Sequence, residues 1–522
     1  MILALACERR TGSNEKRWRT DKNRNREGIV TESWRNRMAE TFQNADWLER
    51  FRDAFDEMVV FKDLKRSNFI ASFKLPSFMR DWVIKRFQDE DGEIDVDAAA
   101  SFIREFIPKK DDWKSVMDRV VTRQERVRFL AKIAVNIDIK TQNVSFELPD
   151  FGLSWKDTII PPDVWVNCGD ALLKSEENWG IVELGYQYPV SAKEPGKIKL
   201  TDFQDFCPYT VDLEEYKYAR ESFSLSEWMD MILSAVDYNA DGYDGELQKF
   251  AMLQRLLPFV EKRLNLMELA PAGTGKSYLF GQISRYGWLV SGKVTRAKLI
   301  YDIGRKKDGV VSARDYVALD EIREAEYMAD PEIQSALQAI MENGAYRAPD
   351  NHEVNVDAGI VFLGNISSER MNEYQNMFVE LPKPFHQPQF LDRIHGFIRG
   401  WELPRMTDDL KVCGWALNSE YFATIMHQLR DDPSYRAIVD ELILLPPGAD
   451  TRDTEAVKRI STAYLKLLFP QVRGASDILP KDFRKYCLNP AMNMRSIIRL
   501  QMGYADEKHR GESVPDFTVR DQ

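Results

Sequence analysis

The segment that most restricts the possible folds of this chain is "LMELAPAGTGKSYLF", residues 266–280. An apolar run is followed by a glycine-containing loop, then a lysine and a serine that open a helical stretch. A strand, a phosphate-binding glycine loop and a helix in this order are typical of parallel α/β sheets. The pattern therefore predicts an α/β fold built around a parallel sheet, with an anion site where the first strand ends.

Each position of this loop has a predicted task. Backbone N–H groups of the loop can surround a phosphate, and the helix that follows adds positive potential at its first turn. Lys276 is expected to bridge the β- and γ-phosphates of ATP, and the Ser277 hydroxyl to ligate Mg²⁺. Ala270 replaces the usual first glycine, and we expect this added methyl at the strand end to be tolerated. The predicted ATP-binding residues are Pro271, Ala272, Gly273, Thr274, Gly275, Lys276, Ser277 and Asp320.

Two further apolar segments end in polar residues downstream of the loop. "YVALDE" (316–321) ends in Asp320, predicted to hold Mg²⁺ together with Ser277, and in Glu321, predicted to polarise an attacking water. "GIVFLGN" (359–365) ends in Asn365, which can orient water or contact the γ-phosphate. In "FLDRIHGF" (390–397), Arg393 is predicted to reach the γ-phosphate of a neighbouring subunit. Together these residues indicate an ATPase.

The order of helix and strand patterns divides the chain into five parts. Residues 1–40 are a polar, basic stretch, expected to be a disordered tail. A mixed α+β domain is expected over 41–235, and the parallel α/β core over 236–403. Strand patterns cease after residue 404, so a helical lid is expected over 404–503, followed by a loose tail over 504–522.

The linker "DYNADGYDGELQ" (237–248) imitates a calcium loop. Asp237, Asn239, Asp241 and Gly242 match ligand and turn positions, but Gln248 replaces the bidentate glutamate of the last position. An acidic, glycine-rich hinge is the better interpretation. The five scattered cysteines form no C-x-x-C pair, and we expect no zinc.

Net charge is −11, so any contact with nucleic acid requires a local basic surface. Residues 281–309 supply seven Lys/Arg against two Asp/Glu. Contact with the DNA backbone and an ordinary solvated surface remain equally open interpretations of this stretch. The predicted DNA-contacting residues are Lys293, Arg296, Lys298, Arg305, Lys306, Lys307 and Arg347. No apolar run is long enough to span a bilayer, which favours a cytoplasmic protein without a membrane partner.

In combination these motifs resemble the BREX-system Lon-like AAA+ ATPases, the BrxL family of bacterial phage defence. "LMELAPAGTGKSY", "VALDE", "GIVFLGN", "FLDRIHGFIRGWELPRM" and "TRDTEAVKRISTAYLKLLFP" carry the resemblance. It implies an AAA+ core with a helical lid and a homo-oligomeric, hexameric ring. It also implies duplex DNA as ligand, bound through the N-terminal domain (41–235) and the channel, and other BREX-type proteins as partners. It also assigns Asn365 as sensor, Arg393 as the arginine finger acting in trans, and Arg495 as a lid arginine on the γ-phosphate.

The chain departs from this family in one large respect. The family commonly continues into a Lon-type protease-like domain, whereas only residues 504–522 follow the last helical pattern, too few for a domain of at least about 50 residues. We therefore expect no protease activity. The main hypothesis is an ATPase that translocates on DNA or remodels it. A protein unfoldase, for which Tyr301 offers an aromatic pore-loop residue, and a nucleotide-switched scaffold are the alternatives.

Overall fold

The computed structural model describes residues 45–64, 75–138, 141–173, 177–189, 195–206, 209 and 211–520. The basic tail predicted for residues 1–40 lies outside this set. The chain divides into two compact units, Met1–Asp53 and Ala54–Gln522. The first helix of the described residues, α2 (Ala45–Phe55), begins in the first unit, and every element discussed below belongs to the second.

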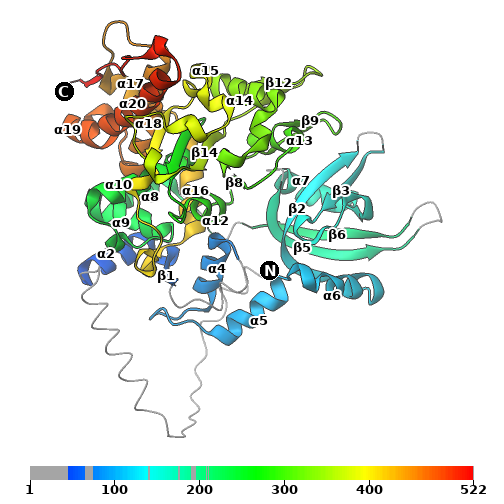
Figure 1. Cartoon of the computed structure of the whole chain (residues 1–522). Coiled ribbons are helices and arrows are strands. Elements are labelled where there is room, and N and C mark those ends of the chain that lie inside the picture. The colour runs from blue at the N-terminus through cyan, green and yellow to red at the C-terminus, as the bar shows by residue number, and fades with distance from the viewer. Residues whose placement is uncertain are drawn as a thin grey trace. The chain divides into compact units, whose positions relative to one another are not determined.

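The second unit contains a five-stranded sheet with the strand order β15-β7-β14-β11-β8. Two of its strands, β8 and β14, are labelled in Figure 1. All neighbouring strands are parallel. The residues of β7 and β11 are buried throughout, as expected of strands covered on both faces. The predicted parallel α/β sheet is therefore confirmed. Its strands are β7 (Leu266–Ala270), β8 (Gly287–Val290), β11 (Tyr316–Leu319), β14 (Gly359–Asn365) and β15 (Gly396–Arg399).

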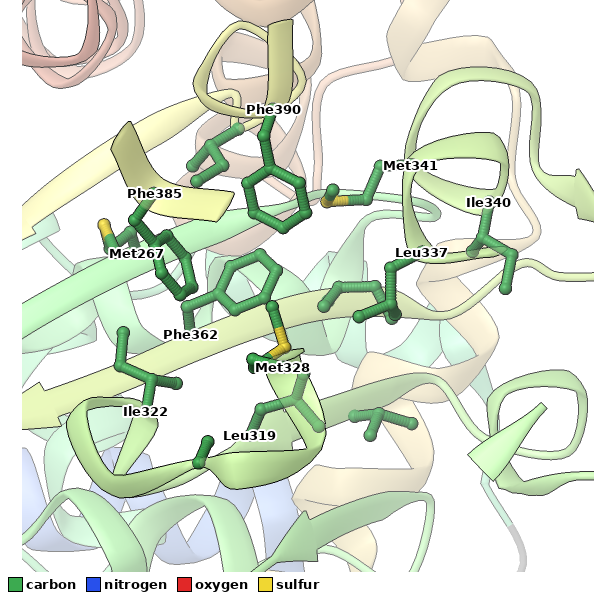
Figure 2. Packing of buried hydrophobic residues seen from close by; sticks show 14 of the residues in the cluster. Met267, Leu319, Ile322, Met328, Leu337, Ile340, Met341, Phe362, Phe385 and Phe390 are labelled. Carbon is green, nitrogen blue, oxygen red and sulfur yellow. The ribbon is translucent and has the colours of Figure 1, made fainter. Parts of the chain in front are cut away.

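One face of this sheet packs against a dense apolar cluster (Figure 2). The ring of Phe362 on β14 lies 5.3 Å from that of Phe385 and 5.7 Å from that of Phe390, centroid to centroid. Ile340 and Met341, near the end of helix α14 (Pro331–Asn343), belong to the same cluster. Such interdigitated side chains leave the strands little freedom, so residues at the strand ends are held on a rigid support.

The N-terminal part contains a second, mixed sheet with the order β3-β2-β5-β6-β4. Strands β5 (Asn178–Gln187) and β6 (Lys197–Asp205) form an antiparallel pair in this sheet. Two helices precede the sheet in the chain, α4 (Ser77–Phe87) and α5 (Val96–Phe106), so the mixture of helices and strands expected for this part is present. The other strands and helices described here are β2 (Val127–Asp138), β3 (Asn143–Glu147), β4 (Thr158–Ile159), α6 (Trp113–Met117) and α7 (Pro162–Leu172).

A two-stranded sheet joins segments from opposite ends of the sequence. Strand β1 (Val59–Asp63) pairs antiparallel with β16 (Cys413–Leu417). The prediction that strands cease after residue 404 is therefore wrong. The five residues of β16 are too short for an unambiguous pattern, and their partner lies about 350 residues earlier in the chain, where local sequence cannot indicate it.

Helices dominate the C-terminal part, as predicted. They are α16 (Ser419–Arg430), α17 (Ser434–Leu442), α18 (Thr451–Leu468), α19 (Pro480–Phe483) and α20 (Asn489–Ala505). Between the N-terminal sheet and the central sheet the chain forms α8 (Leu213–Arg220), α9 (Leu225–Ala235), α10 (Glu246–Leu253) and α11 (Leu257–Val260). A capping box begins α9, since Ser224 and Glu227 exchange side chain to backbone hydrogen bonds. No helix among the described residues combines the length and the apolar character needed to cross a bilayer.

The last residues are not the loose tail that their polar composition predicts. Strand β18 (Thr518–Val519) pairs with β17 (Ile443–Leu444), and the Phe517 side chain beside it is fully buried. One aromatic residue anchors a polar segment, because burying a phenylalanine removes a large apolar area from water.

We expect Phe517→Ala to lower the free energy of unfolding by about 3 to 5 kcal/mol, as for other buried aromatic truncations. Urea denaturation followed by tryptophan fluorescence measures this change. The neighbouring exposed Asp516→Ala is the control and should change stability little. Equal stability of Phe517→Ala and the unaltered chain would mean that the C-terminal segment is not anchored.

Candidate active site

The carboxyl ends of three neighbouring strands bring the predicted site residues together. Strand β14 lies between β7 and β11, and Asn365 at its end pairs in register with Ala270 at the end of β7. Asp320 follows directly after β11. In open parallel sheets, the carboxyl edge is where ligands bind. The glycine loop, Asn365 and Asp320 therefore share one edge of the sheet.

The loop after β7 adopts a conformation that requires its glycines. Gly273 and Gly275 have φ angles of +84° and +80°, a region that L-residues with side chains seldom adopt. Gly275 is the N-cap of α12 (Lys276–Gln282), so the helix begins at the predicted lysine. The buried Lys276 ammonium donates to the Asn365 Oδ1 at 2.9 Å and to the Pro271 carbonyl at 3.3 Å. Burial lowers the pKa of Lys276, which an anionic ligand beside it would offset.

Ser277 and Asp320, the two residues predicted to bind Mg²⁺, are in direct contact. The Ser277 hydroxyl donates to the Asp320 Oδ2 at 2.6 Å, while the Asp320 Oδ1 accepts the Glu321 backbone N–H at 2.9 Å. Mg²⁺ prefers oxygen ligands and usually binds through one or two carboxylates together with substrate phosphates. A hydroxyl and a carboxylate in contact beside the loop fit this preference.

Glu321 differs from its neighbours in backbone conformation. Its φ of +53° lies in the left-handed region, although it is not a glycine, and its side chain is exposed at the sheet edge. Such conformations cost on the order of 1 kcal/mol or more and concentrate at functional sites. The sequence pattern predicted the position of Glu321 but contained no signal for this strain.

The sequence did not predict the role of Arg255, which donates hydrogen bonds to Thr274 of the loop from within the protein core. Its guanidinium pairs with the Glu268 carboxylate on β7 at 2.5 Å, and both side chains are fully buried. It also donates to the carbonyl oxygen of Thr274 at 2.7 Å and to the Thr274 hydroxyl at 3.1 Å. Burial alone would lower the pKa of Arg255, but Glu268 outweighs it and raises that pKa. Glu268 inside the apolar strand "LMELA" could have indicated a buried cationic partner, since buried charges require partners.

The methyl group of Ala270 occupies space that is free because Gly400 has no side chain. The Ala270 side chain is fully buried, and a Cβ built on Gly400 would lie only 2.3 Å from the Ala270 Cβ. Gly400 follows β15, the neighbour of β7 in the sheet. The added methyl therefore packs against an opposing glycine and does not enter the loop, which supports the expectation that it is tolerated.

Arg393 lies at the opposite edge of the sheet from the glycine loop. Its backbone carbonyl accepts the side-chain amide of Asn265, the residue that precedes β7, at 3.4 Å. A strand rises about 3.3 Å per residue, so the five residues of β7 separate Arg393 from the loop by about 15 Å. Its guanidinium pairs with Glu342 at the end of α14. Arg393 and the loop of one chain are therefore not brought together.

Arg495 is also not brought to the loop. Its side chain is buried and pairs with Asp392 at 2.5 Å and with Asp453 at 2.7 Å. It further donates to the Ile394 carbonyl at 2.8 Å, at the same amino edge as Arg393. Two carboxylates and two backbone carbonyls, those of Asp392 and Ile394, already accept hydrogen bonds from the guanidinium. We therefore assign Arg495 to the packing of α20 and leave it out of the site. The assignment to a γ-phosphate came from the family pattern, which carries no information on burial.

The residues predicted to contact DNA lie on the surface around two hairpins, but acids pair with many of them. Lys293 pairs with Glu326 at 2.7 Å, and Arg296 with Glu332 at 3.2 Å. Lys298 lies over the Trp288 ring at 5.3 Å. Lys306 is exposed in the turn between β9 (Tyr301–Asp302) and β10 (Lys307–Asp308). Further pairs are those of Arg305 with Asp302 and of Arg347 with Glu353.

The two hairpins are joined to each other. Tyr301 on β9 stacks on His352 at 4.6 Å and donates to Asp350 at 2.9 Å. Both partners lie in the loop between β12 (Ala345–Arg347) and β13 (Glu353–Asn355). Tyr301 is only 1% exposed, so this aromatic residue is not presented as a pore-loop side chain.

The calcium-loop interpretation of 237–248 has no support in the geometry. The carboxylate of Asp237 accepts from Lys62 at 3.0 Å, from Arg80 at 2.7 Å and from Tyr278 at 2.6 Å. Both of its oxygens are therefore already engaged with protein donors.

Comparison with known proteins gives two family matches. Residues 198–513 match the family described as "Lon-like protease BrxL-like, ATPase domain". Residues 53–186 match "BREX system Lon protease-like protein BrxL N-terminal".

Two curated relatives, each named Lon-like protease BrxL, are similar over most of the chain. One, from Escherichia coli O9:H4 (strain HS), is 26% identical over 455 residues, which is 86% of this chain and 63% of the relative. Another, from Bacillus cereus (strain H3081.97), is 26% identical over 425 residues, which is 80% of this chain and 61% of the relative. The chain thus spans less than two thirds of the length of either relative. Because the ATPase-domain match at 198–513 covers more than half of the 522 residues, the chain belongs to the BrxL family of BREX-system Lon-like proteins.

Proposed function

We propose that this chain is an AAA+ ATPase that binds ATP and Mg²⁺ at the carboxyl edge of the central sheet. The observation that carries the proposal is the contact pattern there: Lys276 against Asn365, and Ser277 against Asp320. Three sequence motifs from separate strands converge on one loop whose glycines have the φ angles that a phosphate cradle needs.

Each residue has a defined chemical task in this proposal. The loop N–H groups and Lys276 bind the phosphates, and Asn365 orients the lysine and the γ-phosphate. Bound Mg²⁺, held by Ser277 and Asp320, would neutralise charge on the phosphate oxygens. Glu321, exposed and outside the Ser277–Asp320 contact, accepts a proton from the attacking water.

The position of Arg393 supports an oligomer. An arginine at the amino edge cannot serve the loop of its own chain, but it can reach the loop of a neighbour. A ring, hexameric by family resemblance, brings these two edges together around each nucleotide. Glu342 then holds Arg393 until a neighbour's γ-phosphate offers a stronger anionic partner.

The energy of hydrolysis is proposed to act on duplex DNA, in translocation or remodelling within a cytoplasmic phage-defence system with other BREX-type proteins. The hairpin turn with Arg305 and Lys306 is the best candidate for backbone contact, since both side chains are exposed. The burial of Tyr301 argues against a protein unfoldase. The unfoldase alternative depended on an exposed aromatic side chain in a pore loop, and Tyr301 was the residue proposed for it.

We expect Lys276→Ala to abolish ATP binding, because the buried ammonium faces the phosphates. Glu321→Gln should keep ATP binding but slow hydrolysis about 10² to 10⁴-fold, the usual contribution of a general base. Phosphate release assays and binding of a fluorescent ATP analogue separate the two effects. Glu324→Gln, an exposed acid three residues later, is the matched control. An unchanged rate in Glu321→Gln would rule out its proposed role.

A mixing experiment tests whether Arg393 acts in trans. Arg393→Ala and Lys276→Ala should each be inactive alone. Mixed oligomers should regain part of the activity, because one subunit supplies the intact loop and its neighbour supplies Arg393. Arg452→Ala, which removes the other arginine paired with Glu342, is the control and should hydrolyse ATP by itself. Mixed oligomers without recovered activity would contradict the trans arrangement.

The double variant Arg305→Ala, Lys306→Ala should weaken binding to duplex DNA. Its plot of log affinity against log salt concentration should become shallower by about 0.9 for each phosphate that the protein no longer neutralises. Fluorescence anisotropy at several salt concentrations measures both quantities. Lys481→Ala on α19, also exposed, should leave them unchanged. Equal salt slopes for the double variant and the unaltered chain would argue against DNA binding by this hairpin.

A further inference from the structure

A buried cluster of charges lies directly behind the first turn of α12. Asp237, at the end of α9, is buried and has a φ of +75°, an unfavourable angle for a residue other than glycine. Its Oδ1 accepts from both Lys62 and Arg80, and its Oδ2 accepts from the Tyr278 hydroxyl. Coulombic attraction from these two cations outweighs burial and holds the pKa of Asp237 well below its usual range.

The cluster is electrically balanced and fully connected. Lys62 and Arg80 each pair with Asp81 as well as with Asp237, at 2.9 Å and 2.8 Å to Asp81. The Lys62 ammonium also donates to the Ser419 hydroxyl at 2.9 Å and to the Ala235 carbonyl at 2.9 Å. Two cations thus face two anions, and none of the four charged side chains is more than 9% exposed. Its members come from β1, α4, the end of α9 and the start of α16.

Tyr278 connects this cluster to the nucleotide loop. It directly follows Lys276 and Ser277 in α12, so any rotation of the first helical turn moves all three side chains. Its hydroxyl contacts Asp237 at 2.6 Å, Ser77 at 2.9 Å and the Arg80 guanidinium at 3.1 Å. Tyr278 is 36% exposed as a whole. Desolvation and then the negative charge of Asp237 beside its hydroxyl raise the pKa of Tyr278, so the hydroxyl keeps its proton and donates to Asp237.

Tyr238, the residue after Asp237, touches the loop from a second side. Its hydroxyl donates to the Gly275 carbonyl at 3.3 Å and lies 2.6 Å from the position that a Cβ on Gly275 would take. The Met406 N–H donates to the Gly273 carbonyl at 2.8 Å. Two adjacent residues, Asp237 and Tyr238, therefore hold the end of the loop and the beginning of its helix.

We propose, on the basis of the ATP site proposed above, that Asp237 is a positioning residue for the phosphate loop. Lys62 and Arg80 hold its carboxylate, and it fixes the loop through Tyr278 and Tyr238. Lys62 and Arg80 both lie within the N-terminal family match at 53–186, whereas the loop lies within the ATPase-domain match. The affinity for nucleotide therefore depends on the N-terminal segment, and a displacement of α4 or β1 loosens the loop.

A purely stabilising role explains this arrangement poorly. Removing four charges from water carries a large desolvation penalty, and well-packed apolar residues often stabilise a core as well or better. The unfavourable backbone angle at Asp237 adds a further cost. Such a network holds its side chains in fixed positions, and Tyr278, which it holds, lies two residues from Lys276.

The test compares Tyr278→Phe, Asp237→Asn and the double variant in the full chain. Asparagine tolerates the positive φ at position 237, and phenylalanine retains the ring at position 278. The readouts are the dissociation constant of a fluorescent ATP analogue, kcat for hydrolysis and the thermal unfolding midpoint. Each single variant should raise the dissociation constant about five- to tenfold, within the usual range of coupling between sites. The double variant should bind about as weakly as the weaker single variant, because the two residues share one hydrogen bond.

Tyr435→Phe is the matched control. Its buried hydroxyl donates to the Pro470 carbonyl, in the C-terminal helices, and removing it should lower the unfolding midpoint without changing nucleotide affinity. If Asp237→Asn fails to fold, Tyr278→Phe decides alone. A dissociation constant for Tyr278→Phe within twofold of the unaltered chain would overturn the positioning role while leaving the ATP site intact. Failure of the unaltered chain to bind the analogue would overturn both proposals.

Discussion

The parallel pairing of β7 with β14 is the constraint on which the rest of the site depends. It sets Ala270 beside Asn365, and it places β14 between the loop strand and the strand that precedes Asp320. Because parallel strands end at the same edge, this one register brings together residues from three segments spread over about 95 positions. A slip of one residue would turn every side chain of the strand to the opposite face and separate Lys276 from Asn365.

Buried ion pairs then hold the loop in place. Arg255 and Glu268 support the loop from within the core through Thr274, while Asp237 and its partners hold the first turn of α12. Such pairs are expensive to bury, and their value lies in geometry more than in stability. Arg495 shows the same chemistry in another setting, since its two carboxylates join α20 to α18 and to the segment before β15.

The arginines also show why residue type alone does not define a role. Arg393 and Arg495 lie at the same edge of the sheet, but one pairs with a single acid near the surface and the other is buried between two. The basic residues of 290–309 are similar in sequence, yet several form ion pairs with acids from distant positions such as Glu326 and Glu332. The number of Lys and Arg residues in this stretch therefore suggests a stronger local positive potential than the folded protein has, because acids from other segments offset part of the charge.

The parallel sheet, the glycine loop and the polar ends of β11 and β14 were predictable from sequence, because each depends on short-range patterns. An apolar run with an acid or amide at its end predicts a buried strand followed by a polar side chain at the sheet edge, and the structure shows this arrangement. The family also followed from these motifs, and the domain matches agree with it.

Tertiary structure alone decided which distant residues meet. The β1–β16 pair, the anchoring of Phe517, the support of Thr274 by Arg255 and the network around Asp237 all join segments without a shared local pattern. Local sequence determines the strands and loops because backbone conformation and periodic burial depend on near neighbours. Partner choice depends on packing and charge balance across the whole chain, which only the folded arrangement defines.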